Sequence, residues 1–177
     1  TGNEMVDPHS LAEVHPKPGT IIESNATVLG KLVEECGGSY VRQFEDEFAK
    51  YQQARYCVGV ANGTDSIEIA LEALGLPKSS EVLVPANTFI ASAEAITRAG
   101  HRVVFCDCDP ETYTISVPDA EKRITRRTRA VIAVHLYGRP CDMGSLLAFA
   151  GKHNLKIIED CAQAHGAVYK GRKVGAI

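Results

Sequence analysis

Apolar and polar positions follow two different periods along this chain of 177 residues. In the N-terminal third, apolar residues recur at helical spacing, first over residues 21–33 and then in a second stripe. The second stripe consists of Val41, Phe44, Phe48 and Tyr51. Side chains three and four positions apart share one helix face, so the spacing predicts two amphipathic helices. Residues 1–20 contain three prolines and show no period, which predicts an irregular N-terminal arm.

From residue 56 onward, short apolar runs alternate with helical segments. The runs, which we expect to be strands, cover residues 56–60, 82–84, 103–106, 130–134 and 156–158. The expected helices cover about 65–75, 90–99, 118–124 and 143–152. The runs begin about 25 residues apart and lack polar alternation, as in parallel strands joined by crossover helices. The sequence therefore predicts an α/β fold with a mostly parallel sheet, followed by a hairpin over 168–174 that turns at Lys170 and Gly171.

Composition and charge exclude several classes of protein. Hydrophobic residues make up 45% and charged residues 23%, as in an ordinary globular domain. Nineteen Lys and Arg against 22 Asp and Glu give a net charge of −3, which offers no basic surface for nucleic acid. The longest uncharged run, 82–93, is too short to span a bilayer, which needs about 20 apolar residues. The first residues carry no secretory signal. We expect a cytoplasmic protein that binds neither nucleic acid nor membrane.

Cysteine and histidine spacing gives no sign of a metal site. The six cysteines stand at positions 36, 57, 106, 108, 141 and 161, and none forms a Cys-x-x-Cys pair or a Cys/His cluster. Three of them fall in or beside expected strands, where a reduced cysteine acts as a small apolar side chain. The sequence thus predicts buried thiols, no disulfide framework and no metal ligands.

Ligands of open α/β sheets bind beyond the carboxyl ends of the strands. After the first run, Ala-Asn-Gly-Thr-Asp-Ser at 61–66 opens a helix. A small turn at a helix start presents free N–H groups to an anion, and Thr64 adds a hydroxyl beside Gly63. The alternative is an ordinary helix cap in which Thr64 or Asp65 satisfies its own helix.

Two further corners carry candidate residues. Phe89 follows the second run, where its ring would stack on a planar ligand or, alternatively, pack at the helix start. Asp160 follows the last run, and a carboxylate there is costly to bury unless it is paired. It would hold a protonated ring nitrogen with Gln163 reaching the same ligand, or else it caps a helix. Glu159 is expected to point to the opposite side of the strand from Asp160.

Five blocks of sequence together resemble a known family. They are Asn-Gly-Thr-Asp at 62–65, Pro-Ala-Asn-Thr-Phe-Ile-Ala at 85–91, Asp-Pro-Glu-Thr-Tyr at 109–113, His-Leu-Tyr-Gly at 135–138 and Glu-Asp-Cys-Ala-Gln-Ala-His-Gly-Ala at 159–167. In this order and spacing, from about residue 21 to 177, the chain resembles the DegT/StrS-type sugar aminotransferases, fold-type-I pyridoxal phosphate enzymes of nucleotide-sugar biosynthesis. The resemblance implies a three-layer α/β sandwich like the large domain of aspartate aminotransferase. Residues 21–177 would be its N-terminal part, and the remaining strands and small C-terminal domain would lie outside this sequence.

The resemblance also implies roles for individual residues. Gly63, Thr64 and Asp65 would cradle the phosphate of pyridoxal 5′-phosphate. Phe89 would stack on the pyridine ring, Asp160 would pair with the ring nitrogen and keep it protonated, and Gln163 would lie near the phenolic oxygen. The implied reaction moves an amino group, typically from glutamate, to a keto group of a nucleotide-linked sugar, in a homodimer.

One departure leaves alternatives open. The Schiff-base lysine of the family follows a Lys-Gly-x-x-Val-Gly hairpin, here at 170–175, and is therefore expected beyond Ile177. No lysine of this sequence stands at that position, so no catalytic nucleophile is assigned within it. A related sugar dehydratase that uses pyridoxamine phosphate, or a non-catalytic binding module of the same fold, fits the sequence as well. A nicotinamide-binding domain is disfavoured because its glycine fingerprint is missing.

Overall fold

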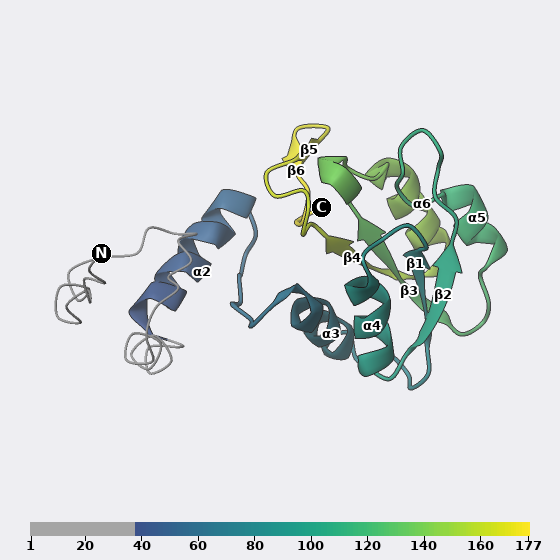
Figure 1. Ribbon diagram of the computed structural model, residues 1–177, viewed down its shortest axis with the longest axis horizontal. Coiled ribbons are helices and arrows are strands. Elements are labelled where there is room, and N and C mark those ends of the chain that lie inside the picture. The colour runs from purple at the N-terminus through teal and green to yellow at the C-terminus, as the bar shows by residue number, and fades with distance from the viewer. Residues whose placement is uncertain (1–37) are drawn as a thin grey trace, which may run out of the picture. The chain divides into compact units, whose positions relative to one another are not determined.

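The computed structural model describes residues 38–177 (Figure 1). The described chain divides into two compact units. Residues 38–51 together with Arg55–Gly59 belong to one, and Gln52–Ala54 together with Val60–Ile177 form the other. The arm expected over 1–20 and the helix expected over 21–33 lie outside the described residues.

The first unit contains helix α2 (Ser39–Gln52) up to Tyr51, which confirms the helix predicted from the second apolar stripe. Three aromatic residues of the stripe stack along it. The ring centroids of Phe44 and Phe48 are 5.4 Å apart, and those of Phe48 and Tyr51 are 6.0 Å apart. The spacing of the stripe therefore produces one continuous aromatic face.

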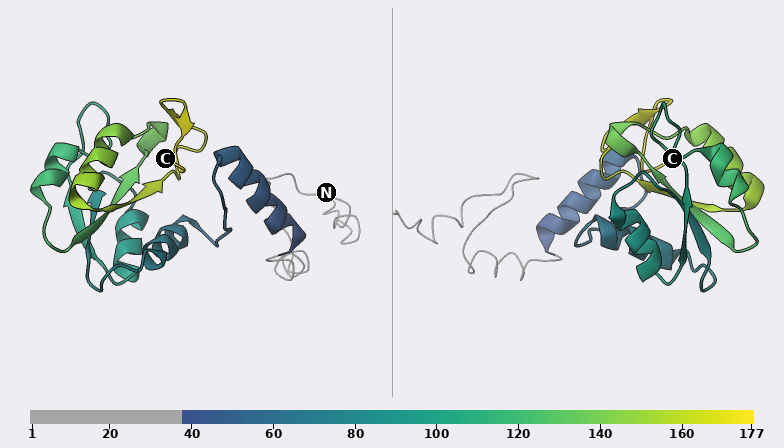
Figure 2. Two further views of the ribbon diagram at one scale, coloured as in Figure 1. Left: turned by 180° about the vertical axis from the view of Figure 1, so that it is seen from behind. Right: turned by 45° about the vertical axis from the view of Figure 1, so that its right-hand side comes forward.

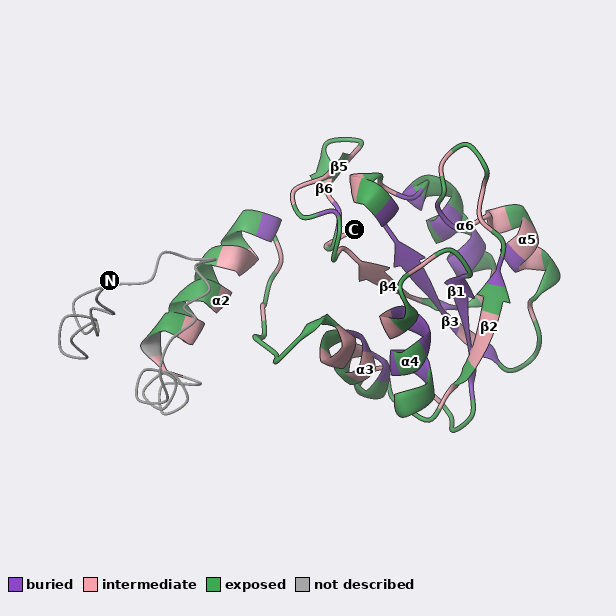
Figure 3. Cartoon of the chain, in the orientation of Figure 1, coloured by how far each residue is buried: buried purple, intermediate pink, exposed green. Residues whose placement is uncertain are grey.

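The second unit is built on a sheet of four parallel strands. These are β1 (Glu81–Pro85), β2 (Arg102–Cys106), β3 (Thr128–Val134) and β4 (Lys156–Asp160), in the order β2-β1-β3-β4. Four of the five predicted runs are strands, and all pair in parallel as expected. The central strands β1 and β3 are the most buried, whereas β2 and β4 form the two edges (Figure 3).

Helices cover both faces of the sheet. Helices α3 (Gly63–Ala73) and α4 (Ile90–Arg98) lie on one face, and α5 (Val117–Lys122) and α6 (Met143–His153) on the other (Figures 1 and 2). Alternate residues of each central strand pack into different cores: Val82 and Val84 face α3 and α4, whereas Leu83 faces α6. This alternation follows from the two-residue period of a strand. It confirms the predicted three layers.

The run over 56–60 is not a strand, which corrects the prediction. Tyr56 and Val58 are instead among the most exposed large apolar residues of the described chain. An apolar run becomes a strand only when a neighbouring strand satisfies its backbone N–H and C=O groups, and none of the described strands pairs with this run. The apolar run therefore indicated a segment able to form a strand, but it has no pairing partner among the described residues.

Strands β5 (Val168–Tyr169) and β6 (Arg172–Lys173) form the predicted hairpin, which turns at Lys170 and Gly171 with φ of 48° and 83°. Positive φ at both central residues is typical of a two-residue hairpin turn. The hydroxyl of Tyr169 donates to Asp142 Oδ1 over 2.7 Å and ties the hairpin to the start of α6. No helix within residues 38–177 is long and apolar enough to cross a membrane.

Candidate functional site

Asp160 ends β4 at the carboxyl edge of the sheet, half-buried between two donors. The hydroxyl of Ser92 donates to its Oδ2 over 3.1 Å, and the main-chain N–H of Ala162 donates to its Oδ1 over 3.1 Å. Ser92 Oγ also lies 3.0 Å from Thr88 Oγ1. Because the single hydroxyl proton of Ser92 is directed to Asp160, Thr88 donates to Ser92. A carboxylate has about four acceptor positions, so Asp160 retains the capacity to accept a further hydrogen bond.

Ser92 links Asp160 to the corner that carries Phe89. Phe89 is the N-cap of α4 and is 70% exposed, and Ser92 follows in the first turn of the same helix. Ser92 is itself only 1% exposed. The Ser92–Asp160 hydrogen bond therefore connects the end of β4 with the start of α4, where Phe89 lies.

Gln163 is joined to the turn after β3. Its Oε1 accepts a hydrogen bond of 2.8 Å from the main-chain N–H of Tyr137, which lies in the 3-10 helix η2 (Leu136–Gly138). Among the described residues, the Gln163 amide nitrogen makes no side-chain hydrogen bond, so its two N–H groups are able to donate to a ligand.

The start of α3 contains the residues that the sequence predicted to bind an anion. Asn62 caps the helix: its side-chain oxygen accepts from Asp65 N over 3.0 Å, and its carbonyl accepts from Ser66 N over 3.1 Å. Within the described chain, the N–H groups of Gly63 and Thr64 have no such partner and remain available to an anion. The position that a Cβ of residue 63 would occupy is open, because no atom lies within 4 Å of it.

The structure does not bring Gly63, Thr64 and Asp65 into contact with Asp160. Asp65 Oδ1 lies 3.3 Å from Nη2 of Arg98, which is the last residue of α4. Asp160 instead contacts Ser92, which lies in the first turn of α4. The helix rises about 1.5 Å per residue, so these two contacts lie about 9 Å apart along α4. The segment before α3 is not a strand, so pairing does not hold the start of α3 at the carboxyl edge of the sheet.

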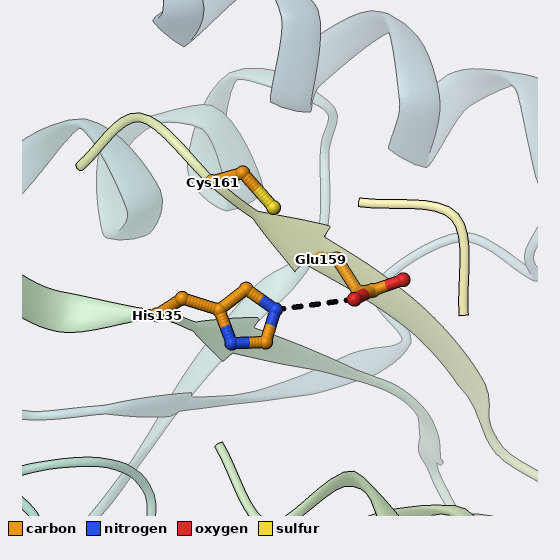
Figure 4. Close-up of side chains that lie close together, drawn as sticks. All are labelled: His135, Glu159 and Cys161. Carbon is orange, nitrogen blue, oxygen red and sulfur yellow. Dashed lines mark hydrogen bonds and ion pairs between the residues drawn. The ribbon is translucent and has the colours of Figure 1, made fainter. Parts of the chain in front are cut away.

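Glu159, the neighbour of Asp160, points to the other side of β4, as the strand period predicted. Its Oε2 lies 3.1 Å from Nε2 of His135 (Figure 4). His135 is completely buried. The main-chain N–H of Cys141 donates to Nδ1 of His135 over 2.9 Å, so Nε2 must carry the proton and donate to Glu159. Two further donors, Gly175 N at 2.9 Å and Ile177 N at 2.7 Å, reach the same carboxylate.

These hydrogen bonds determine the ionisation of Glu159. Burial raises the pKa of its carboxyl group, but the hydrogen bonds from His135, Gly175 and Ile177 outweigh this effect and hold the pKa below its usual range. Burial raises the pKa of the neighbouring Cys161 thiol to about 12, with further contributions from Glu159 and Asp160. The pair therefore consists of an ionised carboxylate beside a neutral thiol.

His135, Glu159 and Cys161 place potential metal-ligating atoms within 4.8 Å of one another. Nδ1 of His135 is already bonded to Cys141, both carboxylate oxygens of Glu159 accept main-chain hydrogen bonds, and the thiol is held in its protonated form. A metal ion at Nε2 would have to displace the His135–Glu159 hydrogen bond. The arrangement is therefore that of a structural hydrogen-bond network. Cys106 and Cys141, each 1% exposed, fit the predicted class of buried thiols, and Cys36 lies outside the described residues. Cys57, Cys108 and Cys161 are only partly buried, which corrects the prediction for them.

A cavity of about 510 Å³ opens on the α6 side of β4. Its walls include Met143, Leu147, Glu159 and Ile177, but neither Asp160 nor Gln163. The cavity therefore lies apart from the predicted cofactor residues.

Sequence reasoning missed Ser92 and the main-chain N–H of Tyr137. A signal existed for Ser92, because it is a small polar residue three positions after Phe89, on a helix face that is otherwise apolar. No signal existed for Tyr137, since a main-chain donor carries no residue-specific mark.

Comparisons with known proteins agree with the resemblance seen in the sequence. The description of the family whose model matches residues 21–177 is DegT/DnrJ/EryC1/StrS aminotransferase family. A curated relative, dTDP-3-amino-3,6-dideoxy-alpha-D-galactopyranose transaminase of Aneurinibacillus thermoaerophilus, is 44% identical over 165 residues, which cover 93% of this chain and 43% of that protein.

Two solved structures share the fold. DesV of S. venezuelae, in complex with a ketimine intermediate, matches with a TM-score of 0.78 and 40% identity, covering 85% of this chain and 42% of that one. A GDP-4-keto-6-deoxymannose-3-dehydratase with a trapped PLP-glutamate geminal diamine matches with a TM-score of 0.74 and 26% identity, covering 84% of this chain and 41% of that one. These matches confirm the predicted fold, and this chain spans about two fifths of the length of each protein.

Proposed function

The chain belongs to the DegT/DnrJ/EryC1/StrS aminotransferase family, and we propose that the whole protein is a pyridoxal-phosphate-dependent aminotransferase acting on a keto sugar linked to a nucleotide. The observation that carries the proposal is the setting of Asp160. A half-buried carboxylate at the carboxyl end of a parallel strand is held by Ser92 and Ala162 and can still accept a hydrogen bond. This is the chemistry that a protonated pyridine nitrogen requires.

The donors and acceptors around Asp160 suit the ring of the cofactor, and those at the start of α3, which does not contact Asp160 in this structure, suit its phosphate. Asp160 would accept from the ring nitrogen, the amide of Gln163 would donate to the phenolic oxygen, and the exposed ring of Phe89 would lie against the pyridine. The free N–H groups of Gly63 and Thr64, with the Thr64 hydroxyl, suit a phosphate; Asp65, bonded to Asn62 and Arg98, would fix the turn that presents them. Bound there, the cofactor supplies an electron sink, which Asp160 sustains by keeping the ring nitrogen protonated.

Identity favours the aminotransferase over the dehydratase. The chain is 44% and 40% identical to the transaminase and DesV, against 26% to the dehydratase. The names of the transaminase and the dehydratase favour a dTDP- or GDP-linked keto sugar as the acceptor. From the family resemblance of the sequence, we also propose glutamate as the amino donor and a homodimeric assembly for the whole protein.

The test is to express the whole protein, load it with pyridoxal phosphate, and supply glutamate with dTDP-linked and GDP-linked keto sugars. We expect an amino sugar nucleotide, detected by mass spectrometry, and 2-oxoglutarate in equal amount. Loss of water from the sugar without gain of nitrogen would instead identify a dehydratase. The absence of both products, in a protein that binds the cofactor, would indicate a binding module.

A further inference from the structure

Two exposed tyrosines face each other across neighbouring turns of the carboxyl edge. Tyr113 lies in the loop between β2 and α5, and Tyr137 lies in the turn after β3. Their ring centroids are 6.4 Å apart in an edge-to-face arrangement, with the residues 53% and 73% exposed. The two touching rings form a small exposed aromatic patch, and tyrosine is enriched on surfaces that bind ligands or partners.

Both tyrosines are held in a backbone conformation that bulky residues avoid. The φ angles are 59° for Tyr113 and 57° for Tyr137. A positive φ in a non-glycine aromatic residue persists only where surrounding contacts enforce it, and such residues cluster at ligand sites. Here the enforcing contacts are hydrogen bonds: Tyr113 N donates to the carbonyl of Asp109 over 2.8 Å, and Tyr137 N donates to Gln163 over 2.8 Å.

The two turns are also joined to each other. Arg139 Nη1 donates to the carbonyl of Glu111 over 3.1 Å, which connects the turn after β3 with the loop after β2. The carboxylate of Asp109 is turned into its own loop, where Oδ1 accepts from Glu111 N and Thr112 N. Hydrogen bonds thus hold both turns that carry the tyrosines, and the exposed Arg139 lies beside the pair.

We propose that Tyr113 and Tyr137 form a stacking platform for the nucleoside base of the nucleotide-linked sugar, with Arg139 positioned to bind its diphosphate. This inference rests on the proposed function and assigns the part of the chain that recognises the nucleotide. Bases of every kind stack on aromatic side chains, and a guanidinium matches phosphate oxygens in a bidentate geometry. The platform adjoins Gln163, so a substrate with its sugar at the cofactor would extend its nucleotide across the tyrosines.

The experiment measures binding without turnover. dTDP and GDP are titrated calorimetrically into the whole protein loaded with pyridoxal phosphate, for the wild type, Tyr113→Ala, Tyr137→Ala and the conservative control Tyr113→Phe. We expect Kd for the preferred nucleotide to rise by about 5- to 100-fold in each alanine variant. The control, which keeps the ring, should stay within about twofold of the wild type. Tyr137→Ala retains the main-chain N–H, so the bond to Gln163 is preserved.

Two further readouts separate recognition from a structural role. The alanine variants should raise KM for the sugar nucleotide with little change in kcat. The absorbance change of the bound cofactor on adding glutamate should remain as in the wild type. Nucleotide affinity unchanged in both alanine variants would overturn the platform, as would a shift to a smaller assembly in sedimentation, which would make the pair a subunit contact. A wild-type protein that binds nucleotide but converts no keto sugar would refute the proposed function and leave the platform standing.

Discussion

Ser92 and Asp160 lie 68 positions apart in the sequence and are joined by a hydrogen bond of 3.1 Å. The bond connects the first turn of α4 to the last residue of β4, and it occupies one acceptor position of Oδ2. With Ala162 N on the other oxygen, Asp160 is held from two sides, so its orientation does not depend on a ligand. Preorganisation of this kind is what an electrostatic partner of a cofactor requires.

Replacing Asp160 should test the charge directly. In the whole protein, Asp160→Ala and Asp160→Asn should each lower the rate of amino transfer by at least about 100-fold, because a buried charge partner is worth several kcal/mol. Asp160→Asn keeps the shape and loses the charge, so near-normal turnover in that variant would show that Asp160 is only a structural acceptor. The rate is measured with saturating cofactor, and thermal unfolding verifies that each variant is folded.

Glu159→Gln should destabilise the protein. The amide offers one acceptor oxygen in place of two, yet three N–H donors, from His135, Gly175 and Ile177, converge on this side chain. Leaving a buried donor unsatisfied costs about 1–3 kcal/mol, which we expect as the loss in free energy of unfolding in urea. Glu94→Gln, a matched change on the exposed side of α4, should have an effect within about 0.5 kcal/mol. Equal effects of the two variants would show that the network contributes nothing.

Because of Asp142, the free energy of unfolding should decrease as the pH falls into the acid range. Hydrogen bonds from Ser145 and Tyr169 lower the pKa of this N-cap carboxyl group to about 2, against about 3.9 in an unfolded chain. A depressed pKa contributes stability that is fully present above about pH 4 and is lost as the pH falls towards 2. Asp142→Asn should therefore unfold at lower urea concentration than the wild type at pH 6, and the difference should shrink between pH 4 and 2. A difference independent of pH would contradict the assignment.

Two glycines in and just after the hairpin allow the energetic costs of backbone strain and of steric crowding to be measured separately. Gly175, with φ of +94°, would place a Cβ 3.0 Å from Gln52 Nε2 and 3.2 Å from Cys161 Sγ. Gly171, with φ of +83°, has no atom within 4 Å of that position. Gly171→Ala should cost only the strain of a left-handed alanine, about 1–2 kcal/mol. Gly175→Ala should cost up to about 1 kcal/mol more, because the side chains of Gln52 and Cys161 must also move. Urea unfolding of both variants measures the difference, and equal costs would exclude crowding at Gly175.

The sequence by itself determined the elements and the alternation within them. Helical spacing, short apolar runs and turn residues predicted four of the strands, α2 to α6 and the hairpin. They could do so because each of these signals lies within the element that it predicts. The two-residue period also placed Glu159 and Asp160 on opposite sides of β4. What only the tertiary structure decided was every partnership between distant residues. Ser92 with Asp160, His135 with Glu159, and Tyr113 with Tyr137 each depend on how strands and turns are brought together. The run at 56–60 failed as a strand for the same reason, since a strand exists only beside another strand and its apolar residues cannot specify that neighbour.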